Sequence, residues 1–551
     1  MSSIERFDIN DIRKNNPVFS NFKTIIETAF YGNNVSKVTE LKKAYELASD
    51  SPGTIKTDIP LFKAKEMGLP DDAKVLVFND GKVFGRTAAA RRIIGQPGID
   101  SDYFSGILRE AIYQGRYKQF YHGTALVGLD ESFMIKTHLM ISQGFENNFY
   151  SYLLNFQILT EKYQNLYRLS KSYDEGDIYL YADPDWSHPD FPHGLALFDP
   201  THNVAAILGL RYFGELKKAT LTLAWAAAHR NNFIACHGGV KQYDLDGEKY
   251  TMAVFGLSGS GKSTITLSNH DNKFNMKVLH DDAFIIEKTT GATTALEPSY
   301  FDKTQDYPML DNSIKYFLTC QNVGVTLDKD SNKVLVTEDI RNGNGRAIKS
   351  RFIIPNREDH LTEKIDSVFW IMKDDSFPPI LKINNPILAS IFGLTLATKR
   401  STAENIVSSE DMNKLVVEPF ANPFRCYALN EDYQDFKNLF DVGETDCYIL
   451  NTGYFRGEKV TPAQTLESIE KIVTKKATFK SFGPLADIAY LPVAGHLPDF
   501  ENTDYINRLS KAMMNRLDFL NQMKTDMAGY NALPEETIEV IEKLMQKLQK
   551  D

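Results

Sequence analysis

Short apolar segments alternate with polar and turn-forming residues along most of the chain. Several of these segments contain β-branched and aromatic residues and lie between Gly, Pro, Asn or Asp residues, a pattern that predicts strands. The predicted strands include residues 74–78, 205–210, 233–236, 250–255 and 367–372.

Other segments have the spacing of helices. A stretch rich in Ala and Leu predicts a long helix from Leu216 to about Ala228. The tail from Tyr505 to Met523 repeats Leu, Ile and Met at helical spacing, which is typical of core packing and carries no functional weight. No repeat with a period of about 20–50 residues is present, so repeat architectures are excluded. We expect a lobe boundary near residue 230.

Composition narrows the functional classes. The 551 residues are 42% apolar and 24% charged, which is close to the average of soluble globular proteins and excludes disordered, collagen-like and coiled-coil chains. With 62 basic and 72 acidic residues the net charge is −10, which argues against a nucleic-acid partner but leaves room for a local basic pocket. No apolar run reaches the roughly 18 residues of a membrane span, and the first residues have no apolar signal core. The four cysteines show neither disulfide nor zinc spacing. We therefore expect a cytoplasmic, enzyme-sized protein without a membrane partner.

Residues 256–263, Gly-Leu-Ser-Gly-Ser-Gly-Lys-Ser, match the phosphate-loop pattern G-x-x-x-x-G-K-[ST]. Glycines allow successive backbone N–H groups to point at phosphate oxygens. Lys262 supplies a positive charge for the β and γ phosphates, and the hydroxyl of Ser263 is a ligand for Mg²⁺. An apolar strand precedes the loop and a helix-compatible segment follows it, so the sequence predicts nucleotide binding rather than an ordinary Gly-Ser turn.

A second apolar segment ends in two carboxylates. Residues 277–280 predict a strand, and Asp281 and Asp282 follow it directly. A carboxylate at the end of a strand beside a phosphate loop is where a divalent metal is commonly held. The alternative is a pair of solvated turn aspartates; the nearby phosphate loop favours the metal role.

Three segments in this order resemble the ATP-dependent phosphoenolpyruvate carboxykinases. They are Tyr212-Phe-Gly-Glu-Leu-Lys-Lys218, His237 at the end of a predicted strand, and the phosphate loop; the family has Tyr-Gly-Gly-Glu-Met-Lys-Lys, a downstream His and Gly-Leu-Ser-Gly-Thr-Gly-Lys-Thr. Further segments are similar to family motifs across most of the chain: Gly85-Arg86-Thr87, Tyr300-Phe-Asp-Lys303-Thr304, Ser350-Arg351-Phe-Ile-Ile-Pro355 and Asn451-Thr-Gly-Tyr.

The resemblance implies an architecture. It is a two-lobed α/β fold, with an N-terminal α/β lobe that binds the substrate and a C-terminal mixed-sheet lobe that contains the phosphate loop. In this chain the lobes would be residues 1–230 and 231–551, with a mobile lid at about 392–419.

The resemblance also implies a set of site residues. A Mn²⁺ ion would be held by Lys218, His237 and Asp282, and the Mg²⁺ of ATP by Ser263. A lysine that binds a metal must be neutral, which burial and nearby positive charges promote. The implied catalytic residues are Lys218, Lys262, Arg351 and Asp281. The implied substrate-binding residues are Arg86, Tyr212, Lys218, Ser258 and Arg351. The implied nucleotide-binding residues are Gly256, Leu257, Ser258, Gly259, Ser260, Gly261, Lys262, Ser263, Thr264, Lys303, Lys459, Val460 and Thr465.

The implied reaction converts oxaloacetate and ATP to phosphoenolpyruvate, CO₂ and ADP, with Mn²⁺ as a Lewis acid and ATP preferred over GTP. The sequence departs from the family pattern at Phe213, at Thr87–Arg91, at Ala283–Phe284 and in the segment 397–402. Two alternatives therefore stay open. One is an enzyme of the same fold that phosphorylates another small acid or a protein, and the other is a nucleotide-binding protein without turnover. The oligomeric state, a monomer or a small homo-oligomer, also stays open.

Overall fold

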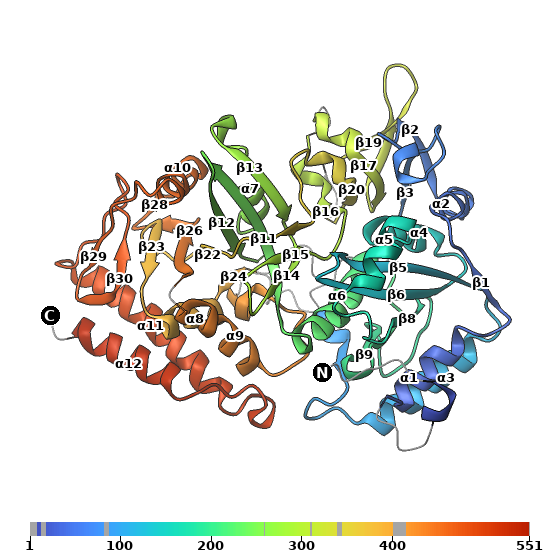
Figure 1. The fold of residues 1–551 in the computed structure, drawn as a ribbon, viewed down its shortest axis with the longest axis horizontal. Coiled ribbons are helices and arrows are strands. Elements are labelled where there is room, and N and C mark those ends of the chain that lie inside the picture. The colour runs from blue at the N-terminus through green and yellow to red at the C-terminus, as the bar shows by residue number, and fades with distance from the viewer. Residues whose placement is uncertain are drawn as a thin grey trace. The chain divides into compact units, whose positions relative to one another are not determined.

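A computed structural model describes residues 8–12, 18–81, 87–257, 259–308, 311–338, 344–399, 415–442 and 444–549. These residues form two compact units (Figure 1). The first unit contains the described parts of residues 1–231 and 294–355, and the second contains those of 232–293 and 356–549. Both units combine helices with mixed sheets, so the predicted α/β fold class is confirmed. Within the described residues, no helix combines the length and apolarity needed to cross a membrane.

The larger sheet of the first unit has parallel and antiparallel neighbours. Its strand order is β1 (Val35–Lys37), β5 (Phe120–Asp130), β6 (Phe133–Ser142), β8 (Ile178–Asp183), β10 (Val204–Leu208), β9 (Leu195–Asp199) and β4 (Arg91–Ile93). Every residue of β10 is buried, as expected for a strand that is covered on both faces. Val204, Ala206 and Leu208 pack with α1 (Asn21–Ala29) and α3 (Ser101–Gly115). The alternate residues face the other side of the sheet, where α6 (Phe213–Arg230) packs.

A second sheet in the first unit joins distant parts of the sequence. Its order is β16 (Tyr300–Lys303), β20 (Arg346–Lys349), β17 (Phe317–Gln321), β3 (Lys74–Phe78) and β2 (Ile55–Pro60). The parallel pairing of β17 with β3 sets Thr319 opposite Leu76. The sequence predicted one division of the chain near residue 230, with everything beyond it in the second lobe. The structure differs because this pairing makes residues 294–355 part of the first unit.

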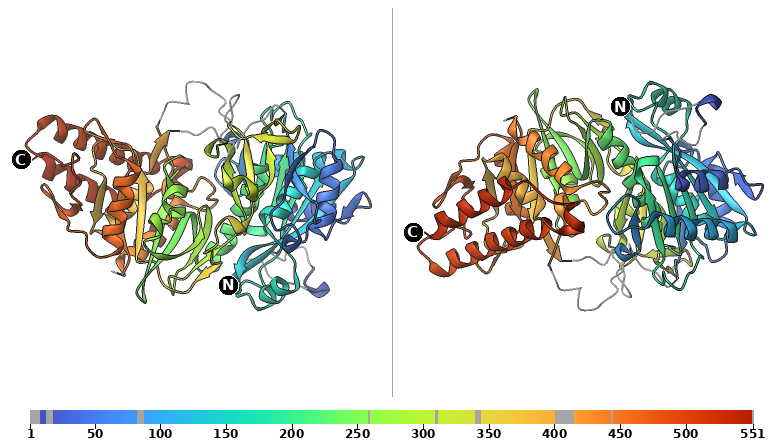
Figure 2. Two further views of the ribbon diagram at one scale, coloured as in Figure 1. Left: turned by 90° about the horizontal axis from the view of Figure 1, so that it is seen from above. Right: turned by 90° about the horizontal axis from the view of Figure 1, so that it is seen from below.

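The second unit is built on a mixed sheet. Its strands include, in spatial order, β14 (Ala283–Glu287), β11 (Phe233–Leu245), β12 (Glu248–Phe255), β22 (Ser367–Met372), β26 (Asp446–Asn451), β23 (Ile380–Ile383), β30 (Leu485–Tyr490) and β29 (Lys480–Phe482), and β13 (Asn275–His280) also pairs with β11. The helices α11 (Thr503–Met523) and α12 (Glu536–Gln549) lie side by side in this unit (Figure 2).

Most predicted elements are present with adjusted bounds. Strand β3 and strand β22 have the predicted limits, and α11 covers the predicted tail helix. Helix α6 begins three residues earlier than predicted, at Phe213, and ends two residues later, at Arg230. Strand β11 continues to Leu245, well beyond the predicted 233–236, because it forms a long antiparallel hairpin with β12.

Candidate functional site

The phosphate loop joins β12 to α7 (Lys262–Leu267) in the second unit. Gly259 and Gly261 have φ angles of +79° and +104°, in the left-handed region that non-glycine residues avoid. A Cβ atom added at Gly256 would lie 2.4 Å from Ser260 Oγ. Glycine is therefore required at three positions of the motif, for backbone conformation at two and for packing at the third. Ser258 lies outside the described residues.

Two side chains from outside the motif hold the loop. Thr452 Oγ donates a hydrogen bond of 2.9 Å to the carbonyl oxygen of Ser260. Lys373 Nζ donates one of 3.1 Å to the carbonyl oxygen of Gly259. These two carbonyl groups accept hydrogen bonds from Thr452 and Lys373, and the backbone N–H groups of the loop remain available for an anion. Thr452 belongs to the Asn451-Thr-Gly-Tyr segment, which resembles a family motif, but the sequence predicted no role for this residue. No sequence pattern indicated Lys373.

The remaining predicted loop residues differ in exposure. Lys262 is buried, Ser263 and Leu257 are half-buried, and Thr264 is exposed. Ser260 is buried, and its Oγ has no hydrogen-bond partner among the described residues.

His237, Asp282 and Lys262 lie together beside the loop. His237 comes from β11, Asp282 follows β13, and Lys262 begins α7. His237 Nε2 lies 2.9 Å from Asp282 Oδ1, and Lys262 Nζ lies 3.5 Å from the same oxygen. The side chains of His237 and Asp282 are 12% and 22% exposed, so this group is open to solvent only in part.

The hydrogen bonds of His237 fit a metal ligand. Its Nδ1 lies 2.5 Å from the carbonyl oxygen of Ala421, which only accepts, so Nδ1 carries the proton. Nε2 lies 2.9 Å from a carboxylate oxygen, an arrangement that suits either a proton on Nε2, which makes His237 an imidazolium, or a cation bound by both atoms. A metal-ligating histidine typically donates its other N–H to a backbone carbonyl in this way. Among the described residues, no three His, Cys, Asp or Glu side chains form a metal-binding group.

The two neighbouring aspartates have different surroundings. Asp281 is buried, and its Oδ1 lies 3.9 Å from Nδ1 of the fully buried His280. That nitrogen accepts the backbone N–H groups of Asp282 and Ala283 at 3.0 and 3.3 Å. His280 is therefore not protonated at Nδ1 and does not form a charged pair with Asp281 there. Of the two carboxylates, Asp282 is the one beside His237 and Lys262.

Three predicted nucleotide-binding residues lie near the Asn451-Thr-Gly-Tyr segment or on the helix after it. Val460 and Thr465 are buried, and the N–H of Val460 donates to the carbonyl oxygen of Gly453 at 3.0 Å. Lys459 is exposed on β28 (Glu458–Lys459). Asn451 is fully buried, and its Nδ2 donates to three backbone carbonyl oxygens, which fixes the turn that presents Thr452 to the phosphate loop.

In the first unit, Tyr212 precedes α6 and is buried. Burial raises the pKa of its phenol, while a hydrogen bond from Arg346 acts in the opposite direction. A Cβ atom added at Gly214 would lie 2.2 Å from the ring of Tyr212, so glycine at this position lets the ring fold over the start of the helix. Phe213, where the sequence departs from the family pattern, packs against Phe301, with ring centroids 5.4 Å apart, and is almost fully buried.

Two adjacent lysines of α6 have distinct environments. Lys217 is buried and pairs with Glu297 at 2.9 Å, with side-chain exposures of 1% and 0%. Lys218 is half-buried, and its Nζ lies 5.8 Å from the centre of the Trp225 ring. Lys218 belongs to the first unit, whereas His237 and Asp282 belong to the second.

Arg351 and Lys303 are also part of the first unit. Arg351 Nη1 donates to the hydroxyl of Tyr163 at 3.2 Å. Lys303 lies opposite Arg346 in the β16–β20 pair. Burial lowers the pKa of Lys303, and the positive charge of Arg346 lowers it further. Such a lysine and arginine pair is suited to an anion.

Some predicted site residues fall outside the described residues. These are Arg86 and Ser258, and residues 400–414 of the predicted lid. On either side of that gap, β24 (Ala397–Lys399) pairs with β25 (Leu415–Val417) in antiparallel register.

Comparison with known proteins gives one consistent result. A family model described as "Phosphoenolpyruvate carboxykinase" matches residues 64–482, more than half of the chain. Similar proteins named "Phosphoenolpyruvate carboxykinase (ATP)" include one from Aeropyrum pernix, 25% identical over 309 residues, covering 53% of this chain and 60% of that protein. The one from Dictyostelium discoideum is 22% identical over 293 residues, covering 48% and 49%. The one from Staphylococcus aureus strain bovine RF122 is 23% identical over 422 residues, covering 69% and 72%. The chain thus spans 60% and 49% of the length of the first two relatives.

Proposed function

Because the chain belongs to the phosphoenolpyruvate carboxykinase family, we propose that it converts oxaloacetate and ATP to phosphoenolpyruvate, CO₂ and ADP. The observation that carries this proposal is the grouping of Lys262, His237 and Asp282 beside a glycine-rich phosphate loop. The loop alone would fit many nucleotide-binding proteins. A histidine and a carboxylate directed at one another next to the phosphate-binding lysine add a place for a second cation.

We propose that the nucleotide is ATP and that its phosphates lie on the loop at residues 256–263. Lys262 is 9% exposed, so its charge is only weakly screened by water. In this environment it stabilises the negative charge that is spread over the γ-phosphoryl oxygens during transfer. The hydroxyl of Ser263 would hold the Mg²⁺ that accompanies the nucleotide.

We further propose that a divalent cation, Mn²⁺ in preference to Ca²⁺, is held by His237 Nε2, Asp282 Oδ1 and the neutral amine of Lys218. When bound, this ion supplies Lewis acidity toward the oxygens of the substrate. The hydrogen bond from His237 Nδ1 to the Ala421 carbonyl orients the imidazole for this role.

The residues of the first unit would bind the substrate. Arg351 and Arg86 are guanidinium groups, which match the planar geometry of carboxylates. Tyr212, whose phenol accepts a hydrogen bond from Arg346, keeps its own O–H for a substrate oxygen. In the reaction the bond from the carboxylate carbon to its neighbour breaks, CO₂ leaves, and the electron pair passes to the enolate oxygen. That oxygen bonds to the γ-phosphorus while the bond to ADP breaks.

A cytoplasmic location and action without a membrane or nucleic-acid partner belong to the same proposal. The lid at about 392–419 would exclude water, which protects the enolate from protonation.

The direct test measures phosphoenolpyruvate formation by the purified chain with oxaloacetate, ATP, Mg²⁺ and Mn²⁺. We expect turnover with ATP that exceeds turnover with GTP. Binding of ATP without any phosphoenolpyruvate would leave the family fold intact but overturn the proposed activity, and phosphorylation of another acid would replace it.

The proposed cation site has a separate test that does not depend on activity. Asp282→Asn keeps the size of the side chain but removes its charge. We therefore expect the affinity for Mn²⁺ to fall at least tenfold, measured by electron paramagnetic resonance in the absence of nucleotide. Asp271→Asn is the matched control, because Asp271 is an exposed acid of the same unit with a side-chain exposure of 91%. Equal Mn²⁺ affinity in the two variants would remove Asp282 from the site.

A further inference from the structure

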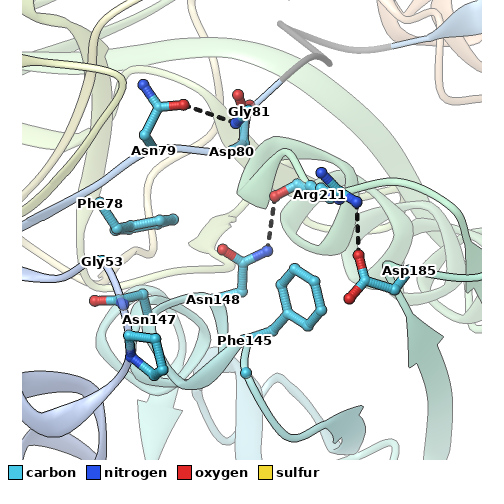
Figure 3. Close-up of a pocket in the computed structure, with 12 residues that line it drawn as sticks. Gly53, Phe78, Asn79, Asp80, Gly81, Phe145, Asn147, Asn148, Asp185 and Arg211 are labelled. Atoms are coloured by element: carbon cyan, nitrogen blue, oxygen red, sulfur yellow. Dashed lines mark hydrogen bonds and ion pairs between the residues drawn. The ribbon is translucent and has the colours of Figure 1, made fainter.

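Buried polar side chains in the two units differ in what they can act on. Asp80 lies at a pocket of about 300 Å³ in the first unit (Figure 3), but both of its carboxylate oxygens are buried beneath the pocket surface. Arg211 at the same pocket pairs with Asp185 at 2.7 Å, so these two charges give a ligand no accessible anchor. In the second unit, buried His280 contacts the turn that carries Asp282, one of the residues proposed to hold a cation.

This turn interrupts the strand pairing along β11. Both β13 and β14 pair with β11; β13 ends at His280, just before Asp281 and Asp282, and β14 begins just after them. The carbonyl oxygen of Asp282 accepts the N–H of Gly238 at 3.0 Å. Gly238 follows His237 in β11, so this bond fixes the carbonyl end of Asp282 beside His237.

The imidazole of His280 binds the other end of the same residue. Its Nδ1 accepts the N–H of Asp282 at 3.0 Å and the N–H of Ala283 at 3.3 Å. The side chain of His280 is 0% exposed, and a buried backbone N–H that loses its acceptor costs free energy. The backbone of Asp282 is therefore held at its N–H by the imidazole and at its carbonyl by β11. Together these bonds set the direction in which the Asp282 side chain leaves the backbone.

We propose that His280 is a positioning residue for the cation site, an inference that rests on the proposed function and deepens it. By holding the backbone of Asp282, His280 directs Oδ1 of that residue to within 2.9 Å of His237 Nε2 and 3.5 Å of Lys262 Nζ. His280 does not bind the cation through Nδ1, because the lone pair of that atom is directed at the two N–H groups. Groups that orient a metal ligand in this way typically change metal affinity by about 10–100-fold.

The experiment compares two variants of the full chain by their Mn²⁺ affinity, measured by electron paramagnetic resonance in the absence of nucleotide. His280→Leu has a side chain of similar size without an acceptor, and we expect its affinity to fall about tenfold or more. His280→Asn provides an acceptor again, since an asparagine oxygen accepts the N–H two residues further on, and its affinity should stay within about threefold of the wild type. Both variants lose the imidazole, so the difference between them reports the acceptor.

His270→Leu is the matched control. The side chain of His270 is also 0% exposed and lies in the same unit, but its imidazole contacts the Tyr243 hydroxyl at 2.9 Å and Glu470 at 3.1 Å. Loss of this buried imidazole should leave the affinity for Mn²⁺ unchanged. Urea unfolding of each variant establishes that folded chains are compared. If His280→Leu does not fold, His280→Asn alone decides, and a loss of affinity in it as large as that of Asp282→Asn would overturn the proposal.

A second measurement separates the positioning of Asp282 from a general effect on the fold. In an Asp282→Asn chain there is no carboxylate left to position, so adding His280→Leu should weaken Mn²⁺ binding less than about twofold. A merely structural role of His280 would lower the affinity by the same factor in both backgrounds.

The possible failures are distinguishable. Wild-type Mn²⁺ affinity in His280→Leu would overturn the role of His280 and leave the cation site in place. Equal losses in His280→Leu and His280→Asn, or equal effects of His280→Leu in the two backgrounds, would do the same. Wild-type Mn²⁺ affinity in Asp282→Asn would instead remove the cation site and this role with it. These measurements need no phosphoenolpyruvate formation, so they are separate from the test of the proposed reaction.

Discussion

The phosphate loop of the second unit and the start of α6 in the first unit present their functional groups in different ways. The loop is a contiguous motif whose conformation depends on glycines and on two neighbouring side chains, Thr452 and Lys373. The start of α6 depends on buried contacts with residues that are distant in sequence, such as Glu297 for Lys217 and Phe301 for Phe213. The residues of the loop are therefore held locally, and those at the start of α6 by the core of their unit.

This comparison predicts opposite consequences for substitutions in the two regions. Changes in the loop should reduce activity and leave the fold intact. Changes in the contacts under α6 should destabilise the fold first and reduce activity as a consequence.

The largest expected effect is on the stability of the first unit. Glu297→Ala removes the carboxylate that pairs with buried Lys217 at 2.9 Å, and with it the acceptor of Asn155 Nδ2, which lies 2.6 Å from Glu297. Breaking a buried ion pair on one side typically costs about 3–5 kcal/mol. We expect a loss of this size in the free energy of unfolding, measured in urea, with early hydrogen exchange in α6.

Glu539→Ala is the control for this variant, because Glu539 forms an exposed i,i+4 pair with Lys543 and should not matter for stability. Wild-type stability of Glu297→Ala would contradict the view that buried charges hold the start of α6.

The next effect is on turnover. Lys262→Met removes the charge that we propose lies beside the γ-phosphate, and loss of one such group typically lowers kcat by about 10²–10³. The free energy of unfolding should change little by comparison, because the loop conformation depends on its glycines and on Thr452 and Lys373 rather than on Lys262. Lys277→Met, at an exposed lysine paired with Glu358, is the control and should keep its kcat. A collapse in the stability of Lys262→Met would show that the two regions do not differ as described.

A smaller effect concerns a buried lysine behind the phosphate loop. Lys241 is fully buried in β11, and its Nζ donates to the carbonyl oxygens of Ile265 and Ser268 at the end of α7, at 2.8 and 2.6 Å. Burial lowers the pKa of Lys241 to about 7. Above pH 7 the folded state loses this proton while the unfolded chain, with an ordinary lysine pKa of about 10.4, retains it. Stability should therefore rise with pH, by about 2 kcal/mol between pH 7 and pH 9.

The measurement is urea unfolding of the wild type and of Lys241→Met at both pH values. The difference between the two proteins isolates this lysine from the other groups that titrate in the range. A wild-type stability curve that rises no more than that of Lys241→Met would show that Lys241 is not titrating in the folded chain.

The smallest expected effect tests the support of the loop. Thr452→Val keeps the shape of the side chain but removes the hydrogen bond to the Ser260 carbonyl oxygen. A bond of this kind contributes about 0.5–1.5 kcal/mol, so the Kd for ATP should rise about two- to tenfold. The KM for oxaloacetate serves as the internal control and should stay the same. An unchanged Kd for ATP would mean that the loop does not need Thr452.

The contiguous features were accessible from sequence. The phosphate loop lies in a short window, and its strand and helix have the predicted positions because each is local. The pairing of His237 with Asp282 required the resemblance to a family, since 44 intervening residues separate the two in the sequence. The structure places them 2.9 Å apart.

The non-local features were not accessible. Strand β3 and strand β17 pair although about 240 residues separate them, and no local pattern indicates such a partner. Phe213 stood out only as a departure from the family pattern, because the sequence does not show that it packs against Phe301. Lys241 did not stand out, because a single lysine in an apolar strand gives no sign that its amine caps a helix.

The central claim is that the chain transfers the γ-phosphoryl group of ATP to the enolate left by decarboxylation of oxaloacetate. The most direct measurement follows γ-³²P-labelled ATP and carboxyl-¹⁴C-labelled oxaloacetate in one reaction with Mg²⁺ and Mn²⁺. Our account predicts that ³²P appears in phosphoenolpyruvate in a one-to-one ratio with the released ¹⁴CO₂, and that Lys262→Met suppresses both. Release of ³²P as inorganic phosphate, or its transfer to another acceptor without ¹⁴CO₂, would contradict it.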